Sequence, residues 1–173
     1  MLPFIAALLS GAAAATGTSD AQVGNLPGVF EAACLDGQAR LSAAEVTPIG
    51  FAALPAPLQQ GLGHPASAKV WQLNSSGHSY LYILDYAAAP GISPKICGLA
   101  SDVMDLNAAA AVLGARVAGG MERGNMRSAQ WLNAKDGYVA TATTAATFNV
   151  LQISWLSDAD RSAAMAQVDQ LPH

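Results

Sequence analysis

The chain has 173 residues, of which 52% are hydrophobic and 12% are charged, and its formal net charge at pH 7 is -4. This composition excludes an intrinsically disordered protein, which combines low hydrophobicity with high net charge. It gives no support for nucleic-acid binding, because domains of that kind usually carry a basic patch or stripe. The length suits one domain with a sizeable hydrophobic core.

The first residues have the features of a secretory signal peptide. An apolar run over residues 1–9 is too short to span a bilayer, and a stretch of small residues follows it. No lysine or arginine precedes the run, and the cleavage rule is met near Ala15 and near Ala21. We therefore expect residues 1–21 to be removed, leaving a secreted or periplasmic protein without an integral membrane span. The alternative is a buried or disordered apolar N-terminus.

The two cysteines, Cys34 and Cys97, lie far apart and belong to no CxxC motif or Cys/His cluster. In an exported chain, two cysteines most simply form one disulfide. We expect a bridge that ties the N-terminal segment to a strand near the middle of the chain. Two separate buried thiols are the alternative.

The single globular domain, residues 22–173, is expected to begin with a helical and irregular arm over residues 22–66. Asn25 caps a short helix with a proline in its first turn. The residues from Ser42 to Glu45 match a capping box, which predicts a second short helix. The prolines and glycines that follow predict an irregular stretch with at most one helical turn.

Residues 69–118 carry the strongest strand signals and predict a unit of three strands and a helix. The expected elements are strands over 69–74, 79–86 and 96–99 and a helix from Ser101. In this interpretation Val103 belongs to the apolar stripe that the helix turns inward.

Residues 128–171 repeat this order, with a Trp-containing first strand, an Asp-Gly turn and a serine before the last helix. That helix is expected to turn Met165, Val168 and Leu171 inward. The similarity suggests internal duplication, although two ordinary meanders followed by helices would look alike. The predicted class is α+β, with an antiparallel sheet of about six strands from two βββα-like units and both longer helices packed on one face. Two facing three-stranded layers are the alternative.

Catalytic motifs are scarce. The sequence contains no HExxH, GxSxG or SxxK motif and no Cys/His group with metal-ligand spacing, so we expect no metal or cofactor. His64 and His78 are expected to be solvated loop residues. Asp85, on an otherwise apolar strand, could form a carboxylate pair with Asp136 or Asp102. The simpler interpretation is structural, with Asp85 near a strand end, Asp136 in a turn and Asp102 in a helix cap.

Two groups of residues are candidate ligand contacts. Arg116, Arg123 and Arg127 concentrate positive charge in a predicted glycine-rich connection, where arginines can bind carboxylate or phosphate. Solvated loop arginines are the plainer interpretation. Alternate tyrosines of one strand could form a binding platform if they are exposed, and would belong to the core if they are covered. These tyrosines are Tyr80, Tyr82 and Tyr86.

The function that these features favour is a non-catalytic binding module. Its partner would be another protein or a small ligand that is anionic or binds aromatic side chains, and we expect no nucleic-acid partner. The alternative is a small periplasmic hydrolase whose Asp, Ser and His residues are dispersed along the chain. A structural subunit or inhibitor is a third reading.

Overall fold

The computed structural model describes residues 25–36, 45–74, 77–87, 89, 93–117, 121–125 and 128–168, with the backbone alone for residues 121–125, 167 and 168. The described elements, in chain order, are α2 (Leu26–Phe30), the π-helical turn η1 (Glu31–Leu35), β1 (Val46–Ile49), the 3-10 turn η2 (Phe51–Ala53), α3 (Ala56–Leu62), β2 (Ser67–Leu73), β3 (Ser79–Asp85), β4 (Lys95–Ser101), α4 (Leu106–Arg116), β5 (Met121–Asn125), β6 (Ser128–Asn133), β7 (Tyr138–Ala145), β8 (Phe148–Trp155) and α5 (Asp158–Val168). No helix among these residues is long and apolar enough to cross a membrane.

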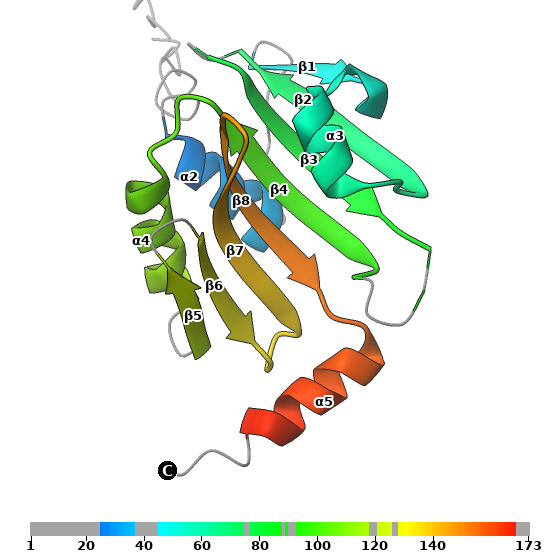
Figure 1. Ribbon diagram of the computed structural model, residues 1–173, viewed down its shortest axis with the longest axis vertical. Coiled ribbons are helices and arrows are strands. Elements are labelled where there is room, and N and C mark those ends of the chain that lie inside the picture. The colour runs from blue at the N-terminus through cyan, green and yellow to red at the C-terminus, as the bar shows by residue number, and fades with distance from the viewer. Residues whose placement is uncertain are drawn as a thin grey trace, which may run out of the picture.

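One antiparallel sheet runs through the described chain, with the strand order β1-β2-β3-β4-β8-β7-β6-β5 (Figure 1). Each half of the chain therefore forms a four-stranded meander, and the two meanders meet where β4 pairs with β8. This arrangement confirms the α+β class. The sheet has eight strands instead of the expected six or so, and a single sheet replaces the alternative of two facing layers.

The two strands that the sequence analysis missed lie at the two edges of the sheet. β1 occurs in the arm that was expected to be irregular, and Pro48 is tolerated there because an edge strand leaves one row of amides unpaired. Glu45 leads directly into β1, while most of the predicted capping box lies outside the described residues. β5 lies within the segment that was predicted to be a glycine-rich connection.

α4 begins later than expected. β4 continues to Ser101, which pairs with Ser79 on one side and Asn149 on the other, so this residue belongs to a strand and caps no helix. The actual cap is Asp105, whose carboxylate accepts a hydrogen bond from the amide of Ala108 at 2.9 Å. Val103 precedes the helix and is 53% exposed, which contradicts its predicted inward position.

α5 is capped as expected, because the hydroxyl of Ser157 accepts a hydrogen bond from the amide of Asp160 at 3.2 Å. Its packing differs from the prediction. Met165 is 39% exposed, whereas Ala164 is buried. The helix continues past the end of β8 instead of lying over the sheet, so α4 alone of the two longer helices packs on a sheet face (Figure 1). The side chain of Val168 and all of Leu171 lie outside the described residues.

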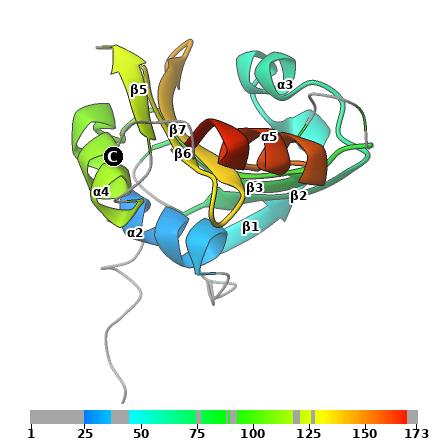
Figure 2. The same ribbon diagram turned by 90° about the horizontal axis from the view of Figure 1, so that it is seen from below.

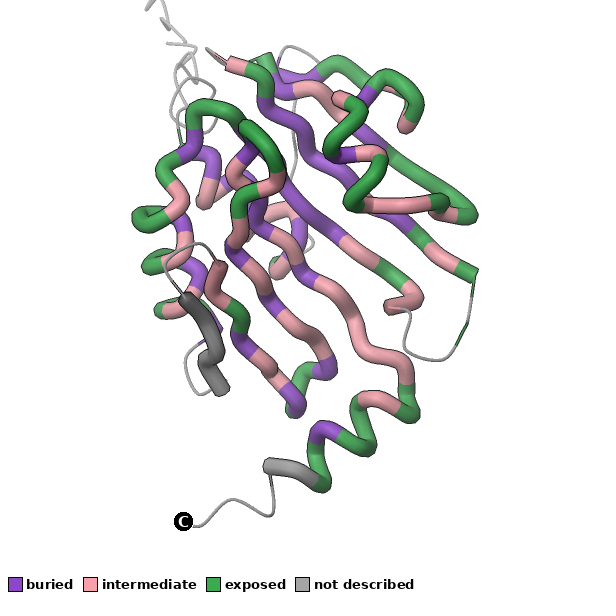
Figure 3. The backbone as a smooth tube through the Cα atoms, viewed as in Figure 1, coloured by how far each residue is buried: buried purple, intermediate pink, exposed green. Residues whose placement is uncertain are grey.

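Helices lie on both faces of the sheet (Figure 2). α2, η1 and α4 cover one face, which we call the helical face, and their buried side chains share a core with the central strands. On the other face, Leu54 and Leu58 of the η2–α3 segment cover a second cluster that includes Val70 and Leu84. Figure 3 shows that buried positions concentrate in the central strands, while the outer turns of α3 and α4 are exposed.

The predicted disulfide between Cys34 and Cys97 is present and buried, with 5.5 Å between the two Cα atoms. It joins η1 to β4, in the middle of the sheet. The cross-link therefore fixes the N-terminal helical segment on the helical face.

Candidate functional site

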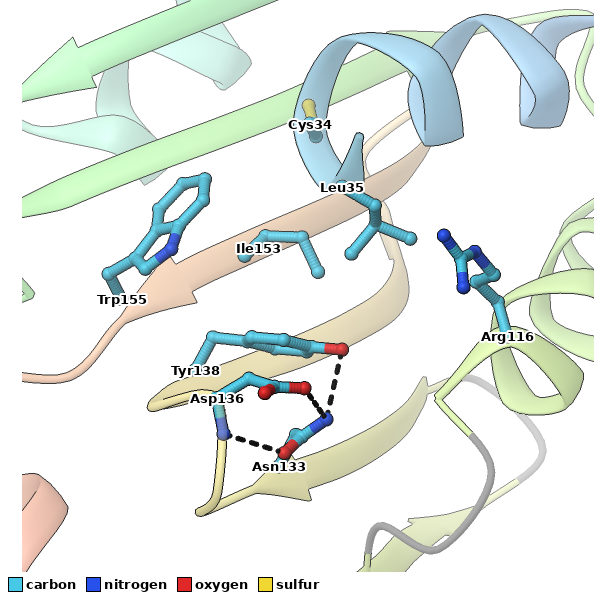
Figure 4. Close-up of a pocket in the computed structure, with 8 residues that line it drawn as sticks. All are labelled: Cys34, Leu35, Arg116, Asn133, Asp136, Tyr138, Ile153 and Trp155. Atoms are coloured by element: carbon cyan, nitrogen blue, oxygen red, sulfur yellow. Dashed lines mark hydrogen bonds between the residues drawn. The ribbon is translucent and has the colours of Figure 1, made fainter. Parts of the chain in front are cut away.

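A pocket of about 370 Å³ opens on the helical face, where η1, the end of α4 and the β6–β7 turn come together (Figure 4). We call it the Arg116 pocket. It is lined by Cys34, Leu35, Arg116, Asn133, Asp136, Tyr138, Ile153 and Trp155. Residues from both ends of the described chain therefore contribute to one cavity.

The β6–β7 turn supplies the polar side of the pocket. The amide side chain of Asn133 holds the turn, since its Oδ1 accepts a hydrogen bond from the backbone amide of Asp136 at 3.0 Å. Its Nδ2 donates to the Asp136 carboxylate at 2.9 Å and to the Tyr138 hydroxyl at 3.2 Å. Gly137 closes the turn with φ at +75°, a conformation that side chains disfavour. The predicted Asp-Gly turn thus holds an amide, a carboxylate and a phenol close together.

Aromatic rings form a second side of the pocket. Tyr138 and Trp155 are direct partners across the β7–β8 pair, so their side chains leave the same face of the sheet. Lys95 is the partner of Trp155 on the other side, and its ammonium group lies 5.2 Å from the centre of a Trp155 ring. A cation at this distance is attracted by the π-system. Ile153 forms apolar lining between the rings and η1 (Figure 4).

An ion pair closes the remaining side. The Arg116 guanidinium donates a hydrogen bond of 2.6 Å to the carboxylate of Asp36, which follows η1. This hydrogen bond and the charge of Asp36 raise the pKa of Arg116, with smaller contributions from Glu31 and Tyr138. Both partners are partly exposed, so the pair fixes the position of the guanidinium more than it stabilises the fold.

The pocket combines one positively charged side chain, Arg116, with two negatively charged ones, Asp36 and Asp136. Arg116 lines it and is paired with Asp36, while Asp136 lines it from the opposite element. Apart from these charges, the walls offer an amide, a phenol and an indole. Such an arrangement can hold a polar ligand by hydrogen bonds while aromatic rings cover its apolar parts.

The structure separates the three predicted arginine contacts. Arg116 ends α4 and lines the pocket. Arg123 lies in β5, opposite Gln130, and its side chain is outside the described atoms. Arg127 also lies outside the described residues. Within the described part of the chain, Arg116 is thus the one member of this group that lies at a cavity.

The predicted tyrosine platform faces away from the pocket. Tyr80 and Tyr82 are 6% and 1% exposed and belong to the cluster on the opposite face. Burial and the nearby Tyr86 raise the pKa of Tyr82. The Tyr86 hydroxyl donates a hydrogen bond of 2.6 Å to the carbonyl of Leu62 in α3, and partial burial raises its pKa. These rings fill the core beneath α3 and offer no open stacking surface.

The carboxylates considered for catalysis lie apart. Asp85 is at one end of the β3–β4 pair and accepts a hydrogen bond from Ser67 at 2.7 Å, whereas Asp102 follows the other end. Asp102 instead holds His78, whose Nδ1 lies 2.9 Å from its Oδ2. This hydrogen bond lowers the pKa of Asp102. Within the described residues, no cluster of three or more potential metal ligands occurs.

The sequence analysis did not identify the two aromatic residues of the pocket as candidate contacts. The aromatic contacts expected from the sequence were the tyrosines Tyr80, Tyr82 and Tyr86, and neither Tyr138 nor Trp155 was among them. Only the strand register puts these two rings opposite each other.

In comparisons with known proteins, the chain matched no protein-family model, no curated protein and no solved structure at a significant level.

Proposed function

We propose that the protein is an exported, non-catalytic binding module whose ligand occupies the Arg116 pocket. The observation that carries this proposal is the meeting of Arg116, Asn133, Tyr138 and Trp155, from α4, β6, β7 and β8, around one open cavity. Ligand sites are typically concave and combine apolar or aromatic walls with a few polar groups that fix orientation.

The proposed export rests on two features. The N-terminal sequence has the composition of a signal peptide. The buried disulfide between Cys34 and Cys97 is compatible with an oxidising compartment, where disulfides form and persist. Comparing the N-terminal sequence of the protein from the envelope fraction with that of the cytoplasmic form would test cleavage near Ala15 or Ala21.

The alternative function is hydrolysis by dispersed Asp, Ser and His residues. The observation in its favour is the pair of His78 and Asp102, because a carboxylate that orients an imidazole is part of several hydrolytic sites. However, the hydroxyls of Ser79 and Ser101, at the neighbouring strand ends, are buried and bonded to each other at 2.8 Å. The pair of His78 and Asp102 does not line the Arg116 pocket. We therefore place binding first.

The test is a screen of neutral and anionic small molecules by protein NMR. Hits should shift the amide resonances of the β6–β7 turn and the indole resonance of Trp155. Arg116→Ala should weaken their binding at least several-fold, whereas Lys69→Ala, which removes an exposed charge on β2, should leave it unchanged. A screen without hits at these resonances, or hits with equal affinity for Arg116→Ala, would contradict the proposal.

A further inference from the structure

The Arg116 pocket continues sideways into a row of polar and aromatic residues at the same end of the sheet. Strand pairing places Asp85 opposite Lys95, Lys95 opposite Trp155, Trp155 opposite Tyr138, and Tyr138 opposite Asn133. Directly paired residues of a sheet point to the same side, so all five side chains leave the helical face. We call them the end row. It crosses five strands and therefore extends about 19 Å at the usual strand spacing.

The end row has its aromatic rings in the centre and its hydrogen-bonding groups on both sides. Trp155 and Tyr138 occupy neighbouring central positions. Lys95 and Asp85 follow on one side, and Asn133 with the adjacent Asp136 follows on the other. A ligand lying along the row would meet aromatic side chains in the middle and hydrogen-bonding groups at each end.

The charges disfavour an anion as that ligand. Arg116 already donates to Asp36 at 2.6 Å, so an anionic ligand would compete with a carboxylate that is tethered beside it. The same ligand would meet Asp136 on the other side of the pocket. A neutral ligand carrying hydroxyl groups avoids both costs, since a hydroxyl can donate to a carboxylate and accept from a guanidinium or an amide.

Sugars combine the two required properties. A pyranose ring exposes C–H groups on its faces, which can lie against an aromatic ring, and hydroxyl groups around its edge, which can pair with planar polar side chains. A purely apolar ligand would remove solvent from the charged groups of Arg116 and Asp136 without offering them new hydrogen bonds, which is unfavourable. The row is also longer than one sugar ring, so the geometry favours a chain of several.

We propose that the Arg116 pocket and the end row bind a neutral oligosaccharide. This inference rests on the proposed binding function and specifies its ligand class. Trp155 and Tyr138 provide the stacking surface, Arg116, Asn133 and Asp136 bind hydroxyl groups in the pocket, and Lys95 and Asp85 bind the part of the chain that extends beyond it.

The probes for the test are maltohexaose, cellohexaose and hexa-N-acetylchitohexaose, all of them neutral, titrated into the full mature protein. At least one should shift the Trp155 indole resonance, and its ring protons should show saturation transfer from the protein and upfield shifts caused by an aromatic ring. The dissociation constant should be nearly the same in 50 mM and 500 mM sodium chloride, because screening by salt does not affect a neutral ligand.

Variants separate stacking from simple loss of structure. Trp155→Ala and Trp155→Leu should each weaken binding at least tenfold, while Trp155→Phe should keep more affinity because it retains a ring. Trp155→Leu maintains an apolar side chain, so it remains informative if the alanine variant does not fold. Gln60→Ala, an exposed polar position on α3, is the control and should bind like the unmodified protein.

The outcomes distinguish the two proposals. If none of the three hexaoses shifts the pocket resonances but small carboxylates do, in a salt-dependent manner, the oligosaccharide inference is wrong and the binding function stands. If neither class shifts them, both proposals are contradicted. Equal affinity of Trp155→Leu and Gln60→Ala for a bound hexaose would also overturn the role of the end row.

Discussion

The ring of Tyr82 lies directly against Gly98, its partner on β4, so that a β carbon at Gly98 would stand 2.4 Å from the tyrosine hydroxyl oxygen. The hydroxyl reaches across β4 and donates a hydrogen bond of 3.2 Å to Gln152 on β8. Gly98 pairs with both residues, which explains how one side chain can span three strands. The absence of a side chain at Gly98 is therefore a condition for packing the centre of the sheet.

Gly98→Ala is expected to destabilise the fold by about 1–3 kcal/mol, because an added methyl group forces a buried ring to move. Urea unfolding followed by circular dichroism measures the change. Gly50→Ala is the matched control, since a β carbon there meets nothing within 4 Å and the backbone φ is -75°. Equal stability of the two variants would show that the Tyr82 ring adapts without cost.

The β7–β8 hairpin predicts a stabilising substitution. Ala146 begins its two-residue turn with φ at 55°, where a side chain costs about 1–2 kcal/mol relative to glycine. Ala146→Gly should therefore raise the free energy of unfolding by about 1 kcal/mol, after part of the gain is offset by backbone entropy. Thr147→Gly is the control and should destabilise, because Thr147 does not adopt a positive φ. Differential scanning calorimetry would compare the two, and a lower Tm for Ala146→Gly would refute the expectation.

Asp102 should contribute a pH-dependent increment of stability. Its hydrogen bond with His78 lowers the carboxyl pKa in the folded state, so the unfolded state binds more protons between the folded pKa and the unfolded value of about 3.9. The contribution is thus complete above the unfolded pKa and is lost as the pH falls through the folded pKa. Because Asp102 is partly exposed, Asp102→Asn should cost less than about 1 kcal/mol at pH 5 to 6.

The measurement for Asp102 is urea unfolding at a series of pH values from 2 to 6. The curves of the unmodified protein and Asp102→Asn should converge at the acidic end. In a His78→Ala background the same substitution should have a smaller effect, because the partner is already missing. A constant difference at every pH would assign the effect of the substitution to packing.

Removing the disulfide should destabilise the protein strongly. The bridge closes a loop with a sequence separation of 63, for which the chain-entropy model gives about 4 kcal/mol. Cys34→Ala with Cys97→Ala should lower the free energy of unfolding by this amount, and the reduced natural protein should behave similarly. The unreduced protein should take up no alkylating reagent after denaturation. Two labelled cysteines per chain would contradict the cross-link.

The class of the fold was predictable because its central strands have strong signals. β3 alternates aromatic and branched residues, and the strand expected over residues 79–86 matches it closely. The edge strands were not predictable in this way. β1 contains Pro48 and β5 contains Gly124, and both residues indicate a turn when the neighbouring strand is unknown. Tertiary pairing supplied the hydrogen bonds that the local pattern did not suggest.

The site was less predictable than the fold, because it depends on register. Arg116 was identified by its charge, but its partner Asp36 is 80 positions away and carries no signal of the pairing. Tyr138 and Trp155 come from neighbouring strands, and a shift of one residue would send one ring to the opposite face. In contrast, Tyr80 and Tyr82 had the more regular pattern and turned out to be core residues, because the η2–α3 segment covers them.

The pair of β4 and β8 is where the proposed ligand would cross from one meander to the other. The two meanders are each built from a continuous piece of chain, and β4 and β8 form the one strand pair between them in the described sheet. Lys95 comes from the first meander, and Tyr138 and Trp155 come from the second. A molecule lying along these residues would contact both meanders. The two meanders could then separate only after the molecule had dissociated. Saturation with ligand should therefore slow amide hydrogen exchange along β4 and β8 more than at the outer strands.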